Sequence, residues 1–489
     1  MIPRLLVRTS IFGLTCLSLA GAARAGVVDP WIATDQSVDC RSMETIRACL
    51  AKDGMPDEAR VLAAFHWFRR NVSHGHGGPP AALLTNFNWQ INVFGCGASQ
   101  RQAEPLAQLW EQMGYRTRGW KVGTATTVEV SYGGRWHLLE PHMNFFVYDR
   151  ETPRNIASVE QIRRDPALVT EAVKEGRACP GFLLCGDPVE MFTATNAWQA
   201  VGSLPGVDAT PEPFGRITLR RGESYVRTWQ PGPYAISRFW PEGFACHSCS
   251  RKDAQDTVNA PFLEPNVWVN VRARYYRHGG AGRLVYAPDL TGDHLLDAAV
   301  AHHNLAPGSM DHRPVWMPAA AGQSGDVTLN IECPYALAAG ELQLERTGTG
   351  ILNAAVSLDK GRTWVALPLF AASNTFSCAF FEPINGTLQG YWLRLGVAPE
   401  TGIAGLQLTT HFLLNPTSLP YLVPGTNRVS VSAGRMDSPL TVSIQWAEGS
   451  EWKEPRTFSR TCATNGSFEV TVGGDKYPRM DELRLSVAP

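Results

Sequence analysis

The sequence predicts a multidomain chain in which an α+β domain is followed by antiparallel β-sandwich domains. Apolar residues recur with helical spacing in the first third of the chain and then give way to a hairpin pattern. Later segments hold short strand-like runs separated by proline and glycine. The 489 residues include 45 Gly, 34 Pro and 15 Trp, and 18% are charged. This length suits two to four domains of about 100–200 residues each, and the composition favours loop-rich β structure over helical bundles.

Helical periodicity and one hairpin define the first domain. The apolar residues that share a helical face after Pro56 are Val61, Leu62, Phe65, Phe68 and Val72. A second helix is expected over residues 100–113, with Ala103, Leu106, Leu109, Trp110 and Met113 facing inward. Strands follow at 126–132 and 135–139, joined by Gly133-Gly134, which is a strong hairpin signal. We therefore expect an α+β domain over residues 26–200 and a proline-rich linker at 201–215.

The remainder of the chain has the pattern of antiparallel β structure. Residues 216–306 carry β-branched and aromatic runs and are expected to form a β-rich domain or segment. A second linker, rich in Pro, Gly and Ser, is expected at 307–326. Residues 327–427 and 428–489 each have the regular short strands and turn signals of a sandwich.

An Asp-box pattern, SxDxGxTW, lies within the first of these sandwiches. Its residues are Ser357, Asp359, Gly361, Thr363 and Trp364. In such a box the Asp and Ser side chains accept hydrogen bonds from turn amides while the Trp packs beneath the turn. The box occurs in several secreted carbohydrate-active folds, away from the chemistry, and we expect a structural role for it here.

Residues 1–25 have the pattern of a secretory signal peptide. Arg4 and Arg8 form a charged n-region before a short apolar run over residues 11–20. Ala23-Arg24-Ala25 is a small-x-small cleavage site. That run is about half the length that a bilayer crossing needs, and no later stretch reaches about 20 apolar residues. We expect cleavage after Ala25, export to the periplasm or the exterior, and no transmembrane segment.

Cysteine usage agrees with an oxidising compartment. The sequence has 11 cysteines, and removal of Cys16 with the leader leaves an even number. The expected disulfides join Cys40 with Cys49, Cys179 with Cys185, Cys246 with Cys249, and Cys333 with Cys378. Cys96 and Cys462 remain, and the sequence leaves their pairing open. The Cys246–Cys249 motif lacks the histidine of haem attachment and the second CxxC of a zinc site.

Charge and motif content exclude several classes of function. The formal net charge is −1 and no block of Lys or Arg occurs, which argues against a nucleic-acid binder. No P-loop, Rossmann fingerprint or GxSxG motif is present, so no cofactor is expected. His302, His303, Asp311 and His312 lack the spacing of helical metal ligands, and we expect a solvated loop there rather than a metal site.

One succession of motifs contains residues of the types that take part in catalysis. It runs from Asn92-Val-Phe-Gly-Cys96-Gly-Ala-Ser99 through the helix to Gly114-Tyr-Arg-Thr-Arg118. It continues with Thr126-Thr-Val-Glu129-Val and Gly134-Arg-Trp136-His-Leu-Leu-Glu140-Pro141. This succession resembles the transglutaminase-like (papain-like) core, closely over residues 92–141 and loosely over 56–200. The resemblance implies a nucleophilic Cys at a helix N-terminus, a His on a following strand and an Asp on the strand after it.

The catalytic residues of that family are not retained in this sequence. The family pattern has the nucleophile four residues before the helix Ala and fifteen before the Gly, and both counts lead to Ser99. The His position, four before Glu129, is Ala125, and the acid position, four after Trp136, is Glu140. The expected Cys-His-Asp therefore becomes Ser99-Ala125-Glu140. Serine is a weaker acid than a thiol and depends more on a base, which Ala125 does not supply.

Other residues are candidates to rescue the chemistry. His142 lies beyond Pro141, and His74 and His76 lie in a Gly-rich loop, so each is a candidate to reach the cleft. Side chains alternate along a strand, so residues 136, 138 and 140 share one face, and His137 should point to the other face, away from Ser99. Cys96 lies one helical turn before the nucleophile position and requires a shifted register. Ser99 has a structural alternative, since Ser99-x-x-Gln102 is a capping box.

Three functions follow from these patterns. The favoured one is a secreted, non-catalytic protein that binds an extracellular polymer, glycan or peptide through the old substrate cleft. The second is a polysaccharide- or peptide-cleaving hydrolase or lyase that reuses the cleft with relocated acid–base residues. For that enzyme the candidates are His74, His76, His142, Glu140 or a Tyr. The third is an active thiol transglutaminase or protease that uses Cys96.

Overall fold

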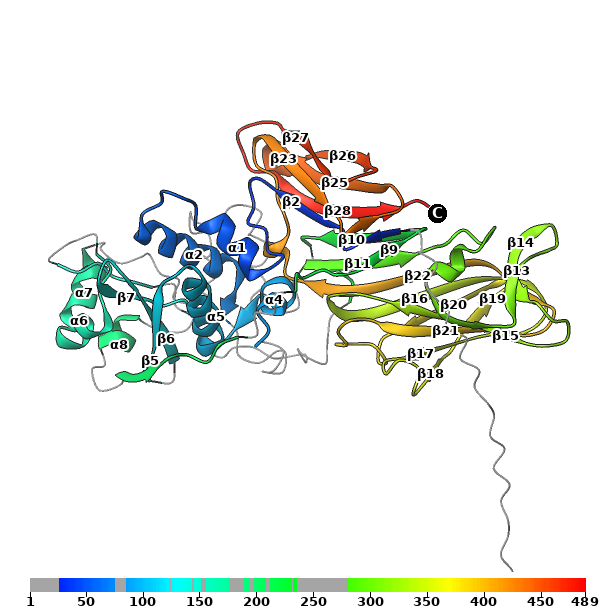
Figure 1. Ribbon diagram of the computed structural model, residues 1–489, viewed down its shortest axis with the longest axis horizontal. Coiled ribbons are helices and arrows are strands. Elements are labelled where there is room, and N and C mark those ends of the chain that lie inside the picture. Colours follow the sequence, from blue (N-terminus) through cyan, green and yellow to red (C-terminus); the bar gives the residue numbers. More distant parts are fainter. Residues whose placement is uncertain are drawn as a thin grey trace, which may run out of the picture.

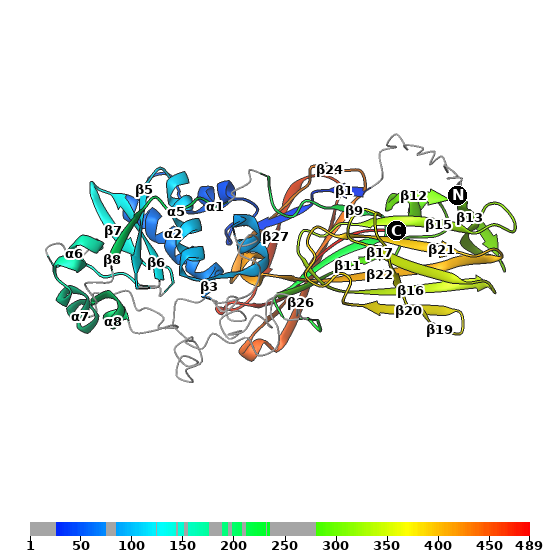
Figure 2. The same ribbon diagram turned by 90° about the horizontal axis from the view of Figure 1, so that it is seen from below.

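The computed structural model describes residues 26–74, 85–123, 125–142, 145–150, 155–175, 188–193, 198–207, 212–230, 232–234 and 280–489. These residues form an elongated molecule with a helical unit at one end and a β body at the other (Figures 1 and 2). The expected leader at 1–25 lies outside the described residues. None of the helices in the described segments is both long and apolar enough to cross a bilayer.

The α+β unit is one antiparallel sheet between two layers of helices. The sheet has the order β7-β6-β5-β8, with β5 (Arg116–Val122), β6 (Ala125–Tyr132), β7 (Arg135–Leu139) and β8 (Trp198–Gly202). One face packs against α1 (Met43–Leu50), α2 (Asp57–Asn71) and α5 (Ser99–Gln112). The other face packs against α6 (Val159–Arg164), α7 (Ala167–Lys174) and α8 (Pro188–Thr193).

The helices and the hairpin predicted for this unit are confirmed. The expected helix after Pro56 is α2, which buries Val61, Phe65 and Phe68. The expected helix over 100–113 is α5, which buries Ala103, Leu106, Leu109 and Trp110. The Gly133-Gly134 turn joins β6 to β7, which pair from Tyr132 with Arg135 to Val128 with Leu139.

The β body consists of two large sheets that share one core. The larger has the order β19-β20-β16-β22-β11-β10-β28-β25-β26, with β14 also paired to β22 and to β13. The smaller has the order β12-β15-β21-β17-β18. Two three-stranded sheets, β24-β1-β9 and β2-β23-β27, complete the body. The bounds of the strands that the structure gives, in chain order, are β1 (Gly26–Val28), β2 (Trp31–Thr34), β9 (Thr218–Arg220), β10 (Glu223–Thr228), β11 (Gly280–Tyr286), β12 (Ala299–His303), β13 (Leu305–Met310), β14 (Arg313–Pro318), β15 (Gly325–Ile331), β16 (Ala336–Gly348), β17 (Leu352–Ser357), β18 (Val365–Leu367), β19 (Phe370–Ala372), β20 (Thr375–Phe380), β21 (Tyr391–Val397), β22 (Thr401–Leu414), β23 (Gly425–Ser432), β24 (Arg435–Met436), β25 (Leu440–Glu448), β26 (Glu454–Cys462), β27 (Gly466–Val472) and β28 (Arg479–Val487).

The strand partners differ from the predicted domain boundaries. β1 and β2, expected in the α+β domain, pair with β24 and β23 of the β body. β10 pairs with β11 on one side and with the C-terminal β28 on the other, so segments 216–306 and 428–489 share a sheet. Residues 307–326, expected as a linker, contain the hairpin of β13 and β14. Its prolines are compatible with a strand because β13 lies at an edge of the sheet.

A buried amide joins the α+β unit to the β body. The Asn415 side chain, at the end of β22, donates to the carbonyl oxygens of Asn71 at 2.9 Å and Ile91 at 2.7 Å. Its backbone N–H donates to Asn92 O at 2.9 Å. Asn71 ends α2, and the other two carbonyls belong to the π-helical turn η1 (Gln90–Phe94). Gly95 follows with a φ of +58°, and a Cβ there would lie 2.7 Å from Asn415 Cγ, so only glycine fits.

The disulfides expected among the described residues are not formed. Cys40, Cys49, Cys333 and Cys378 are all free thiols, as is Cys462. Cys40 donates to its neighbour Val38 O at 3.5 Å, and burial raises the pKa of its thiol well above the ordinary value. Burial also raises the pKa of Cys333 to about 12. Cys378 lies on the buried face of β20, together with Phe376 and Phe380. The other expected pairs, Cys179 with Cys185 and Cys246 with Cys249, lie outside the described residues.

The Asp box forms the predicted turn staple between β17 and β18. Asp359 accepts from Thr363 N at 2.8 Å and from Thr363 Oγ1 at 2.7 Å, and Gly361 N donates to Ser357 Oγ at 2.8 Å. The Trp364 indole donates to Gly361 O at 3.0 Å. The five residues thus satisfy one another within the turn, which confirms the structural role of the box.

We predict that Asp359 titrates far below a free carboxyl. Hydrogen bonds from Thr363, first from its backbone N–H, lower the pKa of Asp359 from 3.8 to about 2. Because the folded-state pKa is depressed, the turn is stabilised above pH 3.8, and this contribution is lost as the pH falls from 3.8 towards about 2. A carboxyl NMR titration, assigned with Asp359→Asn, measures the midpoint. A midpoint near 3.8 would contradict the staple.

Candidate functional site

Ser99, the predicted nucleophile position, is the first residue of α5 and is buried. Its Oγ accepts a hydrogen bond from Thr126 N on β6 at 3.1 Å. The capping box predicted for this residue is wrong, because the N-cap is Ala98 and makes no side-chain capping bond. Gln102 instead donates to Gly97 O at 2.8 Å and accepts from Arg69 at 2.7 Å. The Ser99 hydroxyl therefore satisfies a strand amide rather than its own helix.

Ala125, the predicted histidine position, is adjacent to the amide that Ser99 holds, but its side chain lies on the other face of the sheet. Val128 and Val130 pack with α5, and side chains alternate along a strand. Ala125 accordingly packs with Trp120 and Leu138, in the core that covers α6 to α8. A histidine at this register would face away from α5.

Glu140, the predicted acid position, is completely buried. It forms an isolated bridge with Phe145, with N···O distances of 2.9 and 3.0 Å. One carboxylate oxygen, Oε1, accepts from His142 N at 2.6 Å. Phe145 belongs to the same core as Ala125, so Glu140 also lies on the sheet face opposite α5. The carboxylate closes the turn that follows β7.

Of the histidines named as rescue candidates, the side chain of His142 lies within the description, and it forms no hydrogen bond with Ser99 there. His142 is 8% exposed, and its amide is bonded to Glu140. His74 pairs through its backbone with Gly97, in the short ladder of β3 (Ser73–His74) and β4 (Cys96–Gly97), and its side chain lies outside the description. His76 lies in segment 75–84, also outside the described residues. Within the described part of the chain, no imidazole forms a hydrogen bond with Ser99 Oγ.

His137 is also engaged elsewhere. Its ring nitrogens lie 2.7 Å from Ile156 O and 3.2 Å from Tyr132 O, and the ring stacks on Tyr132 at 3.7 Å. Leu139 packs in the core on the α5 side, and His137, two residues before it on the same strand, lies on that face as well. The expectation that residues 136, 138 and 140 face α5 is therefore wrong.

Cys96 is separated from the helix that the family pattern would place it on. It lies on β4, is 1% exposed and packs in the core of the β body rather than against α5. A thiolate nucleophile requires a partly exposed setting, and Cys96 is buried.

The residues that frame the triad positions form one closed polar cluster. Glu129 is completely buried and accepts from Arg118 Nε at 2.6 Å, Trp120 Nε1 at 2.6 Å and Val159 N at 2.7 Å. Arg118 also lies over the Trp136 ring at 4.3 Å and pairs with Glu160 at 2.9 Å. Burial acts to lower the pKa of Arg118, but bonds to Glu160 and Glu129 outweigh it and raise the pKa. The motif residues Arg118, Glu129 and Trp136 thus attach α6 to the sheet.

A pocket of about 430 Å³ opens between the α+β unit and the β body. Its walls come from segments 86–89, 212–216 and 332–334, with Gln389 at the side. Trp89 ends the short helix α4 (Phe87–Trp89), which Asn86 caps by accepting from Trp89 N at 3.0 Å. Asn88 donates to Glu212 O at 3.0 Å and so ties two of the walls together.

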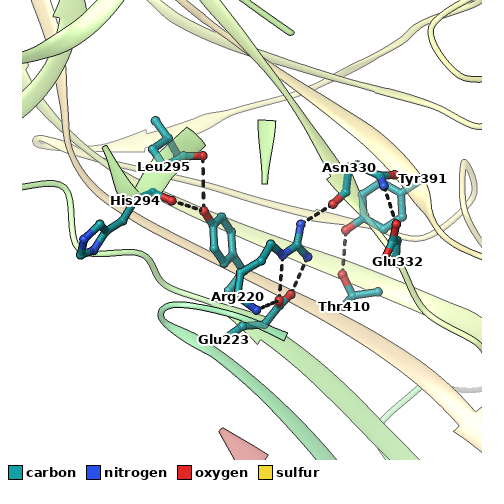
Figure 3. A network of polar contacts seen from close by, with 9 residues as sticks. Arg220, Glu223, His294, Leu295, Asn330, Glu332, Tyr391 and Thr410 are labelled. Carbon is teal, nitrogen blue, oxygen red and sulfur yellow. Dashed lines mark hydrogen bonds and ion pairs between the residues drawn. The ribbon is translucent and has the colours of Figure 1, made fainter. Parts of the chain in front are cut away.

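A buried ion-pair network supports the third wall of this pocket (Figure 3). Arg220 donates twice to Glu223, at 2.8 and 2.7 Å, and once to Asn330 O at 2.6 Å. The Asn330 side chain in turn donates to Glu332 Oε1 at 2.9 Å. Burial acts to lower the pKa of Arg220, but attraction to Glu223 raises it above its ordinary value. The pocket carboxylate Glu332 is therefore held by a rigid support.

Sequence reasoning missed this pocket, and no motif marks it. Its walls are far apart in the chain and meet where β9, β10 and β15 place Arg220, Glu223 and Asn330 together. The nearest signal is the run of amides and aromatics at residues 86–92, which has no repeating period.

Metal ligation has no support in the described segments, where no three His, Cys, Asp or Glu side chains gather. His302 and His303 are exposed on β12, which corrects the expected loop, and His303 Nδ1 lies 4.0 Å from Asp326. Asp311 and His312 form the exposed turn between β13 and β14.

We predict that Glu223→Gln destabilises the protein by about 3–5 kcal/mol, because it leaves the Arg220 cation buried without its counter-charge. Urea unfolding measures the loss. The control Glu469→Gln, on the exposed side of β27, should change stability by less than about 0.5 kcal/mol. The double variant Arg220→Met/Glu223→Met should recover much of the loss; equal stability of Glu223→Gln and the wild type would contradict the assignment.

Cys96 should resist alkylation in the folded protein. Iodoacetamide applied without reductant should leave it unmodified, because the buried thiol does not meet the reagent, and modification should follow unfolding in guanidinium. Peptide mass spectrometry reads both states, with the partly exposed Cys462 as the internal reference. Equal rates at the two residues in the native state would contradict the burial of Cys96.

Comparison with known proteins identifies no relative by sequence. No family model matches this chain, and no curated protein matches it. Among solved structures, the pilus backbone of Streptococcus pneumoniae aligns at 10% identity and a TM-score of 0.13, over 33% of this chain and 43% of that chain. Paenibacillus xanthan lyase aligns at 11% identity and a TM-score of 0.16, over 39% of this chain and 26% of that chain. This chain thus spans less than half the length of either neighbour.

Proposed function

We propose that this chain is an exported, non-catalytic protein that binds an extracellular polymer, glycan or peptide. In this proposal the α+β unit is a transglutaminase-like domain without a working triad. The order of its elements supports the assignment, since α5 is followed by the antiparallel strands β5, β6 and β7. The retained letters Arg118, Glu129 and Trp136 support it as well, because they occupy one structural cluster.

The observation that carries the proposal is the hydrogen bond from Thr126 N to Ser99 Oγ. A serine nucleophile needs a base that removes its proton during attack. Ser99 Oγ instead accepts a hydrogen bond from a strand amide, and Ala125 brings no imidazole to it. The hydroxyl contributes to stability: without it, the buried Thr126 N–H would lose its acceptor.

Binding in place of catalysis is supported by the pocket at the joint. It contains an aromatic ring, amides and carboxylates from both parts of the molecule, which is the mixture that small-molecule sites use to orient a ligand. Its volume of about 430 Å³ lies within the usual range for such sites, about 300–1,000 Å³.

The test compares Ser99→Ala with the wild type. We expect no peptide hydrolysis, amine transfer or polysaccharide cleavage above buffer from either protein. We also expect a loss of about 1–3 kcal/mol in the free energy of unfolding, because a buried amide is left without an acceptor. The control Ser377→Ala, on the exposed side of β20, should change stability by less than about 0.5 kcal/mol. Glycan and peptide arrays then identify the bound class.

Two outcomes would overturn the proposal. Activity that disappears in Ser99→Ala and persists in Ser377→Ala would make Ser99 a nucleophile. Release of reducing ends or peptide fragments that survives Ser99→Ala would instead support an enzyme with relocated acid–base residues.

A further inference from the structure

We infer that the pocket between α4 and the β body binds a neutral sugar residue of a polysaccharide chain. This rests on the proposed binding function and names its ligand class. The pocket has a floor and walls from three segments, and its rim is open, because Glu212 has a 72% exposed side chain and Gln389 is exposed. An open rim lets a polymer enter and leave on either side of the bound residue.

Trp89 supplies the surface on which a sugar ring would lie. It lines the pocket and is half-buried, with part of its indole packed against the core of the β body. Among the described residues no acceptor pairs with the indole N–H, which leaves a donor for a sugar oxygen. The C–H face of a pyranose is the apolar surface that an aromatic ring of this kind buries.

The polar groups of the pocket match the hydroxyl groups of a sugar. A hydroxyl both donates and accepts, so carboxylates and amides serve it equally well. Glu332 uses Oε1 for Asn330 and retains Oε2 as an acceptor. Gln389 lies at the rim with both an amide donor and a carbonyl acceptor. Glu332 is pre-positioned by the network of Figure 3, so little ordering accompanies binding.

The charges around the pocket favour a neutral ligand over an anionic one. Arg216 is the cation in the lining, and two carboxylates already compete for it: Glu212 at 3.4 Å and Asp29 at 3.6 Å. Glu332 adds a further negative charge beside them. An acidic sugar or a phosphate would meet this negative excess without a free counter-charge.

Close packing fixes the wall that carries Arg216. Gly215 has a φ of +85°, and a Cβ at this position would lie 2.8 Å from the Trp31 ring. Only glycine allows the backbone to approach Trp31 this closely. The segment therefore cannot shift toward Trp31 to enlarge the pocket for a bulkier chain such as a folded peptide segment.

The test uses the full-length protein after leader removal, with calorimetry against cellohexaose and maltohexaose as neutral probes. Oligogalacturonate is the anionic probe and a random peptide library is the competitor. Binding of at least one neutral probe, with oligogalacturonate at least tenfold weaker, is expected. Trp89→Leu keeps an apolar side chain against the core but removes the platform, and it should weaken binding at least tenfold.

Matched variants separate the pocket from the rest of the surface. Trp452→Leu removes a half-buried indole that donates to Tyr477 O and is not part of the pocket lining, and it should leave the dissociation constant unchanged. Gln389→Gly removes an exposed rim side chain at a position with a φ of +74°, so it should fold even if Trp89→Leu does not. It should weaken the neutral probe about tenfold, as should Glu332→Gln, which retains the acceptor for Asn330.

Each other outcome overturns the inference. Neutral binding that is insensitive to Trp89, Gln389 and Glu332 would place the sugar elsewhere and leave the proposed binding function intact. Tighter binding of oligogalacturonate, or displacement by peptides alone, would reject a neutral sugar as the ligand. No binding of either neutral probe would also reject it, and polymer cleavage would reject the proposed function as well.

Discussion

The arrangement of the whole molecule depends on the amide of Asn415. Two buried carbonyls at the end of α2 and in η1 accept from its side chain, and a third accepts from its backbone. These carbonyls face the β body, where water does not satisfy them, so the joint has a fixed partner for each. The pocket lies between the same two parts of the molecule, and its geometry therefore depends on this joint.

In the α+β unit, the residues around Glu129 hold α6 against the sheet. Glu129 with its three donors attaches α6 to the sheet, and this task needs the same residues whether or not chemistry takes place nearby. The three positions predicted for a triad make structural contacts. Ser99 serves a strand amide and Glu140 closes a turn, while the methyl group of Ala125 packs in a core. Each of these contacts contributes to the stability of the unit.

The sequence was informative for most features that depend on local contacts, although the expected Cys40–Cys49 disulfide is not formed. Helices α2 and α5, the Gly133-Gly134 hairpin and the Asp box each depend on residues close together in the chain, and all were predicted. Strand partners are different, because an alternating pattern reveals a strand but not its neighbour. The linker at 307–326, the separate C-terminal sandwich and the Cys333–Cys378 disulfide failed for this reason. The pocket was invisible because its walls share no motif, and the capping box failed because Gln102 found Arg69 on another helix.

The pairing of β1 and β2 with β24 and β23 has a consequence for biogenesis. β1 finds β9 once residue 220 has been made, but its other neighbour is β24, where Val27 lies beside Met436, and β2 pairs with β23, where Ile32 lies beside Val431. At about 5–20 residues per second, synthesis leaves an interval of roughly 20–80 s in which β2 lacks β23 and β1 lacks β24. During that time Ile32, which is buried in the finished fold, is exposed to other chains. A chain that stops before β23 would keep these strand edges open permanently, and such edges are templates for aggregation.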